Sequence, residues 1–78
     1  MFYTYILLLS DNTFYHGSSS NLKQRFIDHQ RGIVPSTKNL RPVKLIFYAA
    51  FSTQDKATSF ERYLKTGSGY AFRNKHLL

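Results

Sequence analysis

Four side chains near the start of the chain belong to types that transfer protons or neutralise negative charge. Tyr5 and Tyr15 lie in two short apolar stretches, and Arg25 and His29 follow them four residues apart. A guanidinium binds phosphoryl oxygens, whereas a phenol or an imidazole can accept or relay a proton. Hydrolysis of a phosphodiester needs both kinds of group, because water must be activated while charge on the phosphoryl oxygens is neutralised. This concentration of side chains therefore predicts a phosphodiester-cleaving site.

A β-hairpin would bring the two tyrosines together. Residues 2–9 and 13–17 are predicted strands, joined by a polar loop of three residues. With a loop of that length Leu7 faces Tyr15, so Tyr5 and Tyr15 become diagonal neighbours on one face of the sheet. A two-residue loop would place them on opposite faces. We expect the three-residue register.

The arginine and the histidine belong to a predicted helix. Residues 18–21 are of helix-capping types, and Gly32 is a suitable residue to end the helix. Arg25 and His29 lie one turn apart, beside an apolar stripe, so they share a face near the buried seam. A polar loop over residues 33–41 follows.

One more strand and two more helices are predicted beyond this loop. Residues 43–51 are strand-like, and Ser52 to Asp55 form a Ser-x-x-Asp pattern that opens a second long helix. Residues 67–69 break that helix. Residues 70–78 form a short terminal helix, from which Phe72 and either Leu77 or Leu78 pack inward.

The resulting order β-β-α-β-α-α predicts an α/β protein of the α+β type, with a three-stranded, largely antiparallel sheet flanked by helices. The length of 78 residues predicts one small domain spanning residues 1–78. Seven Phe and six Tyr would supply much of its thin core.

The composition limits the class of partner. Eleven Lys and Arg against four acidic residues give a net charge of +7, which favours a polyanion such as nucleic acid. An acidic protein partner, or solubility alone, would also explain the charge. The chain contains no cysteine, which excludes disulfides and zinc–thiolate sites. No stretch resembles a membrane span or a signal peptide, so we expect a soluble cytoplasmic protein.

The motifs resemble a known nuclease family. The tripeptides Tyr3-Thr4-Tyr5 and Tyr15-His16-Gly17, with Leu22, Arg25 and His29, are similar to the two-part signature of the GIY-YIG nuclease superfamily. Further along, the chain resembles small stand-alone bacterial members of this family, which are related to the catalytic N-terminal domain of the excision-repair incision nuclease. The residues that carry this resemblance are Gly32, Ser36–Asn39, Arg41-Pro42, Glu61 and Tyr63–Gly69. The chain departs from the signature at Tyr3-Thr4, in place of Gly-Ile, and at His16, in place of Ile.

The resemblance implies that a tyrosine of the hairpin, either Tyr5 or Tyr15, acts as the general base. We favour Tyr5 as the base, with Tyr15 bracing the phosphate or water. His29 would hydrogen-bond to a tyrosine and could accept or relay the proton instead, because imidazole titrates near neutral pH. Arg25 would hold the phosphate. Glu61 would bind one divalent cation, Mg²⁺ or Mn²⁺, because the chain has too few carboxylates for a two-metal site.

Simpler explanations exist for the same residues. Tyrosines commonly fill strands and cores, and an arginine on a short helix is usually solvated. Glu61 could instead form a salt bridge with Arg62, with Lys65 or with a basic residue of the first helix. A phenol also titrates near 10, so a tyrosine base needs help from its surroundings.

Further residues are implied as nucleic-acid contacts: Gly17, Ser36, Thr37, Lys38, Arg41 and Asn74. The leading hypothesis is a metal-dependent endonuclease acting on DNA, with RNA as another possible substrate. The alternatives are a non-catalytic nucleic-acid-binding module of the same fold and a pure interaction domain. A protein partner or a homodimer would then supply specificity.

Overall fold

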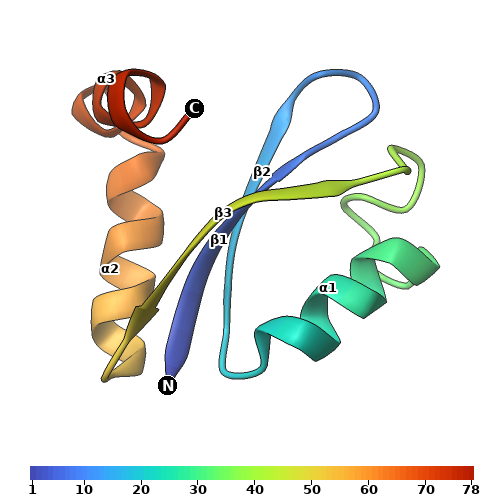
Figure 1. Cartoon of the computed structure of the whole chain (residues 1–78), viewed down its shortest axis with the longest axis horizontal. Helices are drawn as coiled ribbons and strands as arrows, with labels where there is room; N and C mark the ends of the chain where they lie inside the picture. The colour runs from blue at the N-terminus through green and yellow to red at the C-terminus, as the bar shows by residue number, and fades with distance from the viewer.

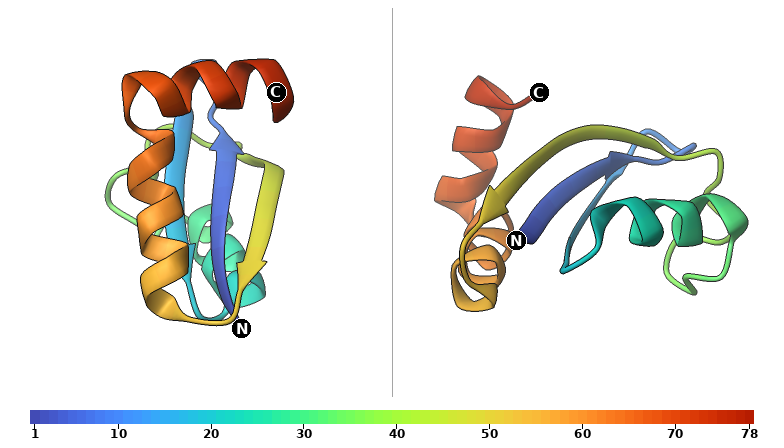
Figure 2. Two further views of the ribbon diagram at one scale, coloured as in Figure 1. Left: turned by 90° about the vertical axis from the view of Figure 1, so that its left-hand side faces the viewer. Right: turned by 60° about the horizontal axis from the view of Figure 1, so that its bottom comes forward.

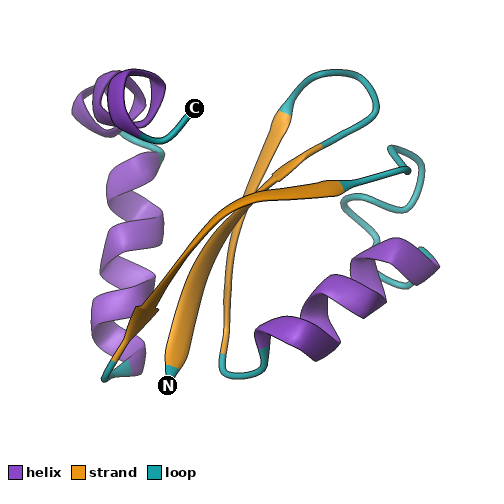
Figure 3. Ribbon diagram, viewed as in Figure 1, coloured by secondary structure: helices purple, strands orange, loops and turns teal.

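The computed structural model describes all residues from 1 to 78. The chain forms β1 (Phe2–Leu8), β2 (Phe14–Ser19), α1 (Leu22–Arg31), β3 (Lys44–Phe51), α2 (Gln54–Leu64) and α3 (Gly67–His76), as Figures 1 and 3 show. The predicted element order and the α+β fold class are confirmed. None of the three helices is long and apolar enough to span a lipid bilayer.

The three strands form one antiparallel sheet with β1 in the centre, in the order β2-β1-β3. Leu7 pairs with Tyr15 and Tyr5 pairs with Gly17, so the predicted three-residue register of the hairpin is confirmed. Asn12 adopts a φ of 66° in the loop, a left-handed conformation that asparagine tolerates better than most residues.

The central strand is buried on both faces because helices cover the sheet from opposite sides (Figure 2). Successive side chains of a strand point to opposite faces. Tyr5 and Leu7 therefore face α1, whereas Thr4 faces α2 and donates a hydrogen bond to the Ala57 carbonyl. The core below α1 consists of Tyr5, Leu7, Leu9 and Val43. This layering places Tyr5 inside the protein, with its phenol directed towards α1.

The first helix has the ends that its sequence predicts. The Asn21 side chain accepts a hydrogen bond from the Gln24 amide at the start of α1, and Gly32 ends the helix with a φ of 77°. The prediction for α2 was wrong by one residue, because Thr53 caps that helix in place of Ser52. Thr53 is extended, and its hydroxyl accepts from the Lys56 amide.

The C-terminal helix differs most from the sequence-based expectation. A break was predicted at Gly67, but the helix begins there. The Thr66 hydroxyl accepts a hydrogen bond from the Gly69 amide and so caps the first turn. Gly69 packs so closely on the end of α2 that a side chain there would overlap the Tyr63 carbonyl. Phe72 is exposed, contrary to the prediction that it packs inward, and the buried residue of this turn is Arg73.

Candidate active site

A chain of three hydrogen-bonded side chains lies between β1, α1 and the loop that follows α1. The Tyr5 hydroxyl is 2.9 Å from His29 Nε2, and His29 Nδ1 is 2.8 Å from Thr37 Oγ1. All three residues are almost completely buried. The predicted hydrogen bond between His29 and a tyrosine is therefore confirmed, and its partner is Tyr5. Because both ring nitrogens are engaged, the imidazole is held in one orientation.

Tyr15 and Gly17 form the β2 side of this cluster. The Tyr15 ring lies edge-on to His29 at 4.9 Å and tilted towards Tyr5 at 6.3 Å between ring centroids. Gly17 is buried because the Tyr5 phenol lies over it. A Cβ at position 17 would sit 2.5 Å from the Tyr5 hydroxyl oxygen, so only glycine leaves room for the phenol.

Arg25 brings a positive charge to the two phenols from the half-buried side of α1. Burial opposes the charged guanidinium, but interactions with the oxygens of Tyr5 and Tyr15 outweigh it and raise the pKa of Arg25. Burial raises the pKa of Tyr5 to about 12, although the neighbouring Arg25 acts in the opposite direction. Tyr5 is therefore a neutral phenol at neutral pH.

His29 is neutral as well. Burial and the nearby Arg25 lower the pKa of His29, and Asp28 opposes that shift only in part. A neutral imidazole carries one free lone pair, which can accept the phenolic proton of Tyr5. The pair can therefore pass a proton inward from Tyr5 to His29, a route that a tyrosine alone would lack.

Glu61 lies on α2, on the other side of the sheet. Its negative charge still acts on the cluster and contributes to the raised pKa of Tyr5. Its side chain is 19% exposed and pairs with Lys65 Nζ at 2.9 Å. No group of three or more His, Cys, Asp and Glu side chains converges anywhere in the chain. A lone carboxylate fits a magnesium-type ion that takes its remaining ligands from water and phosphate oxygens, provided that Lys65 moves aside.

The loop residues predicted to contact nucleic acid are separated by the structure. Thr37 is fully buried against His29, so its predicted role at the surface was wrong: its hydroxyl is committed inside the protein. Ser36 and Lys38 remain exposed. Arg41 is exposed, but its guanidinium donates to the carbonyl of Gln30 in the last turn of α1 and to the carbonyl of Lys38 in the loop.

A buried cation and a buried histidine lie together on the opposite face of the sheet, an arrangement that the sequence did not predict. Arg73 of α3 is 6% exposed, lies between the rings of Phe14 and Tyr70, and donates to His16 Nε2 at 3.3 Å. Asn74, a predicted nucleic-acid contact, accepts two hydrogen bonds from Arg73 and is itself exposed. The one signal in the sequence was His16, which departs from the family signature.

Comparisons with known proteins show the family to which the chain belongs. The GIY-YIG catalytic domain family matches residues 1–75 of the chain. The protein therefore belongs to the GIY-YIG catalytic domain family, a nuclease superfamily whose members generally use a divalent metal ion.

Among its relatives are small proteins named UPF0213. One from Limosilactobacillus reuteri is 37% identical over 67 residues, covering 82% of this chain and 70% of the relative. Another from Pediococcus acidilactici is 39% identical over 70 residues, covering 86% and 71%. The solution NMR structure of a UPF0213 protein from Bacillus halodurans matches with a TM-score of 0.56 and 25% identity, over 91% of this chain and 80% of that one.

Proposed function

We propose that this protein is a divalent-metal-dependent endonuclease that hydrolyses phosphodiester bonds in DNA. The observation that carries the proposal is the hydrogen bond between the Tyr5 hydroxyl and neutral His29, beside the guanidinium of Arg25. A buried phenol, a neutral imidazole and a cation supply the proton acceptor and the phosphate-binding charge that hydrolysis needs.

The pair Tyr5–His29 removes the difficulty of a tyrosine acting as base. As the attacking water forms its bond to phosphorus, its proton passes to the Tyr5 oxygen while the phenolic proton passes to His29 Nε2. The phenol is neutral before and after the step, so its pKa of about 12 is no obstacle. His29 becomes an imidazolium whose Nδ1–H donates to Thr37. The bond from phosphorus to the leaving oxygen then breaks, and that oxygen takes a proton from solvent.

Arg25 and Glu61 would handle the negative charge. Arg25 would donate to the phosphoryl oxygens, with the Tyr15 hydroxyl bracing the phosphate or the water. Glu61 would hold one Mg²⁺ or Mn²⁺, which when bound neutralises charge on the phosphoryl and leaving oxygens. The Lys65 ammonium now paired with Glu61 would turn to the phosphate backbone.

A non-catalytic nucleic-acid-binding module is the second candidate. The ion pair between Glu61 and Lys65 favours it, because a metal ion would have to displace the Lys65 ammonium from that carboxylate. A binding module would use the net charge of +7 without turning over its ligand.

Cleavage assays separate the two candidates. Labelled single-stranded, duplex and branched DNA and RNA are incubated with Mg²⁺ or Mn²⁺ and the wild-type protein, Tyr5→Phe or Glu61→Gln. We expect metal-dependent products from the wild type and a loss of about 10²- to 10⁴-fold in rate for each variant. The matched controls are Tyr63→Phe and Asp55→Asn, exposed side chains of α2 that should leave the rate unchanged. Nucleic-acid binding without any cleavage would establish the second candidate instead.

A further inference from the structure

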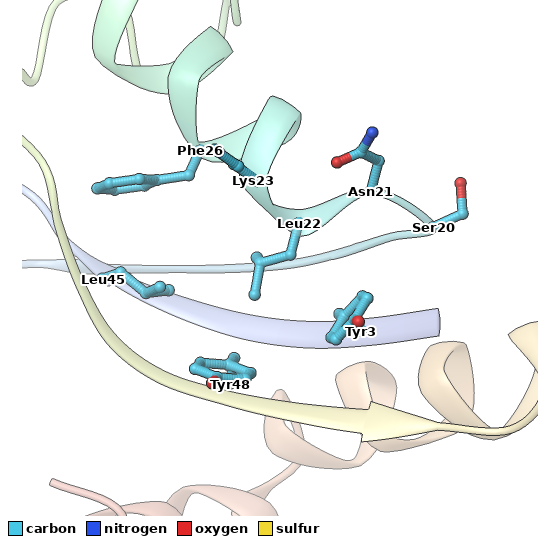
Figure 4. A pocket seen from close by; sticks show the side chains of 8 residues that line it. All are labelled: Tyr3, Ser20, Asn21, Leu22, Lys23, Phe26, Leu45 and Tyr48. Atoms are coloured by element: carbon cyan, nitrogen blue, oxygen red, sulfur yellow. The ribbon is translucent and has the colours of Figure 1, made fainter. Parts of the chain in front are cut away.

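An apolar groove of about 490 Å³ lies between α1 and the strands β1 and β3, outside the proposed catalytic cluster. Figure 4 shows the helix side chains Leu22 and Phe26 on one side and the strand side chains Tyr3, Leu45 and Tyr48 on the other. Tyr48 is 56% exposed, a large fraction for an aromatic side chain. The groove thus offers aromatic surface that nothing else in the chain covers.

The rim of the groove is polar and carries one cation. Ser20, Asn21 and Lys23 line its edge, at the start of α1. The volume is in the range typical of sites for small organic groups. An aromatic floor with a cationic rim matches a nucleotide, whose base stacks on aromatic rings while its phosphate meets a lysine.

The groove is built from the same elements as the catalytic cluster. Tyr3 lies two residues before Tyr5 on the same face of β1, a separation of about 7 Å along a strand. Phe26 directly follows Arg25 in α1. A nucleic-acid strand whose phosphate is held by Arg25 would need only a short stretch of sugar-phosphate backbone to pass around the start of α1 and reach the groove.

We propose that this groove binds an unpaired nucleobase of the nucleic-acid strand, stacked against Tyr3 and Tyr48 with Lys23 on its phosphate. This proposal rests on the proposed function and narrows its substrate class. Bases inside a duplex are stacked on their neighbours and cannot enter, so the preferred substrate carries at least one unpaired nucleotide beside the scissile phosphate. A second copy of the chain is the less favourable occupant, because each copy carries a charge of +7.

Binding is measured in a Glu61→Gln background, so that cleavage does not interfere. The probes are a labelled 12-mer of single-stranded DNA, the same sequence as RNA, and the blunt DNA duplex. We expect the single strands to bind about tenfold or more tightly than the duplex. Tyr48→Ala should lower single-strand affinity by about tenfold, whereas Tyr48→Phe should retain it. The matched control is Tyr63→Ala, which removes an exposed tyrosine of α2, a helix that contributes no residue to the groove.

Base insertion is read directly with 2-aminopurine placed at successive positions of the 12-mer. We expect quenching at one position, lost in Tyr48→Ala and kept in Tyr63→Ala. A stronger signal with the DNA or the RNA 12-mer identifies the sugar. Circular dichroism verifies that each variant is folded.

Three results would overturn the base-binding groove: equal affinity of Tyr48→Ala and its background for single strands, an equal loss on the duplex, or dissociation of a dimer by Tyr48→Ala in sedimentation. Cleavage by the chain with Glu61 intact is scored separately on the same probes. Binding that depends on Tyr48, without any cleavage, would support the base-binding groove and contradict the proposed nuclease activity. Cleavage together with binding that does not depend on Tyr48 would support the nuclease activity and contradict the groove.

Discussion

At the scale of the residue, Thr37 is the inner end of the hydrogen-bonded chain that begins at Tyr5. Replacing its hydroxyl by a methyl group in Thr37→Val leaves His29 Nδ1 buried without a partner. We expect the free energy of unfolding to fall by about 1–3 kcal/mol. Any cleavage rate should drop about tenfold, because the imidazole is no longer held in place. Urea unfolding and the cleavage assay measure these two effects.

Thr37→Ser is the control for this prediction, because it keeps the hydroxyl. It should retain most of the stability and most of the rate. Equal stability of Thr37→Val and the wild type would show that the bond to His29 contributes little.

Two buried histidines also make the stability depend on pH. Burial lowers the pKa of His29 and of His16, with help from Arg25 beside the first and Arg73 beside the second. Below about pH 6.5, where an unfolded histidine gains a proton, the unfolded state binds more protons than the folded state, so stability falls as the pH drops. Above that pH both histidines are neutral in the folded and the unfolded state, so they no longer make the stability depend on pH.

Urea unfolding at pH 7.5 and pH 5.0 tests this expectation. The midpoint should be lower at pH 5.0, and His16→Gln should reduce the difference. His76→Gln, which changes an exposed histidine at the end of α3, is the control. A midpoint that is constant between the two pH values would contradict the prediction.

At the scale of the element, the junction between α2 and α3 contains two glycines, Gly67 and Gly69, and its packing requires only the second to be glycine. A Cβ at Gly69 would overlap the backbone of Tyr63 and Leu64, whereas a Cβ at Gly67 meets nothing within 4 Å. We expect Gly69→Ala to lower the free energy of unfolding by about 1–3 kcal/mol, because the end of α2 and the start of α3 must separate. Gly67→Ala should be neutral or stabilising by up to about 1 kcal/mol. Equal thermal midpoints for the two variants would refute the packing argument.

At the scale of the whole molecule, the net charge of +7 predicts how binding depends on salt. If about four cations neutralise phosphates of a single strand, affinity should fall about 50-fold between 50 and 200 mM salt. Fluorescence anisotropy with the inactive Glu61→Gln protein measures this slope. Affinity that hardly changes with salt would favour a protein partner over nucleic acid.

The fold was predictable because its signals are local. The polar loop set the hairpin register, and Gly32 ended the first helix where a left-handed residue was needed. Local signals failed at the third helix, where Gly67 and Gly69 read as a break. Gly69 is required there by a contact with the end of α2, which no local pattern records.

The candidate site divides along the same line. The sequence alone determined that the side chains of Tyr5 and Tyr15 face those of Arg25 and His29. Alternation along the strands places the tyrosines on one face of the sheet, and the helical repeat places the other two on one face of the helix. Only the tertiary structure decided that Thr37 faces inward to His29 and that Arg73 is buried beside His16. These contacts join residues from different elements, and their geometry depends on how helices and loops pack on the sheet.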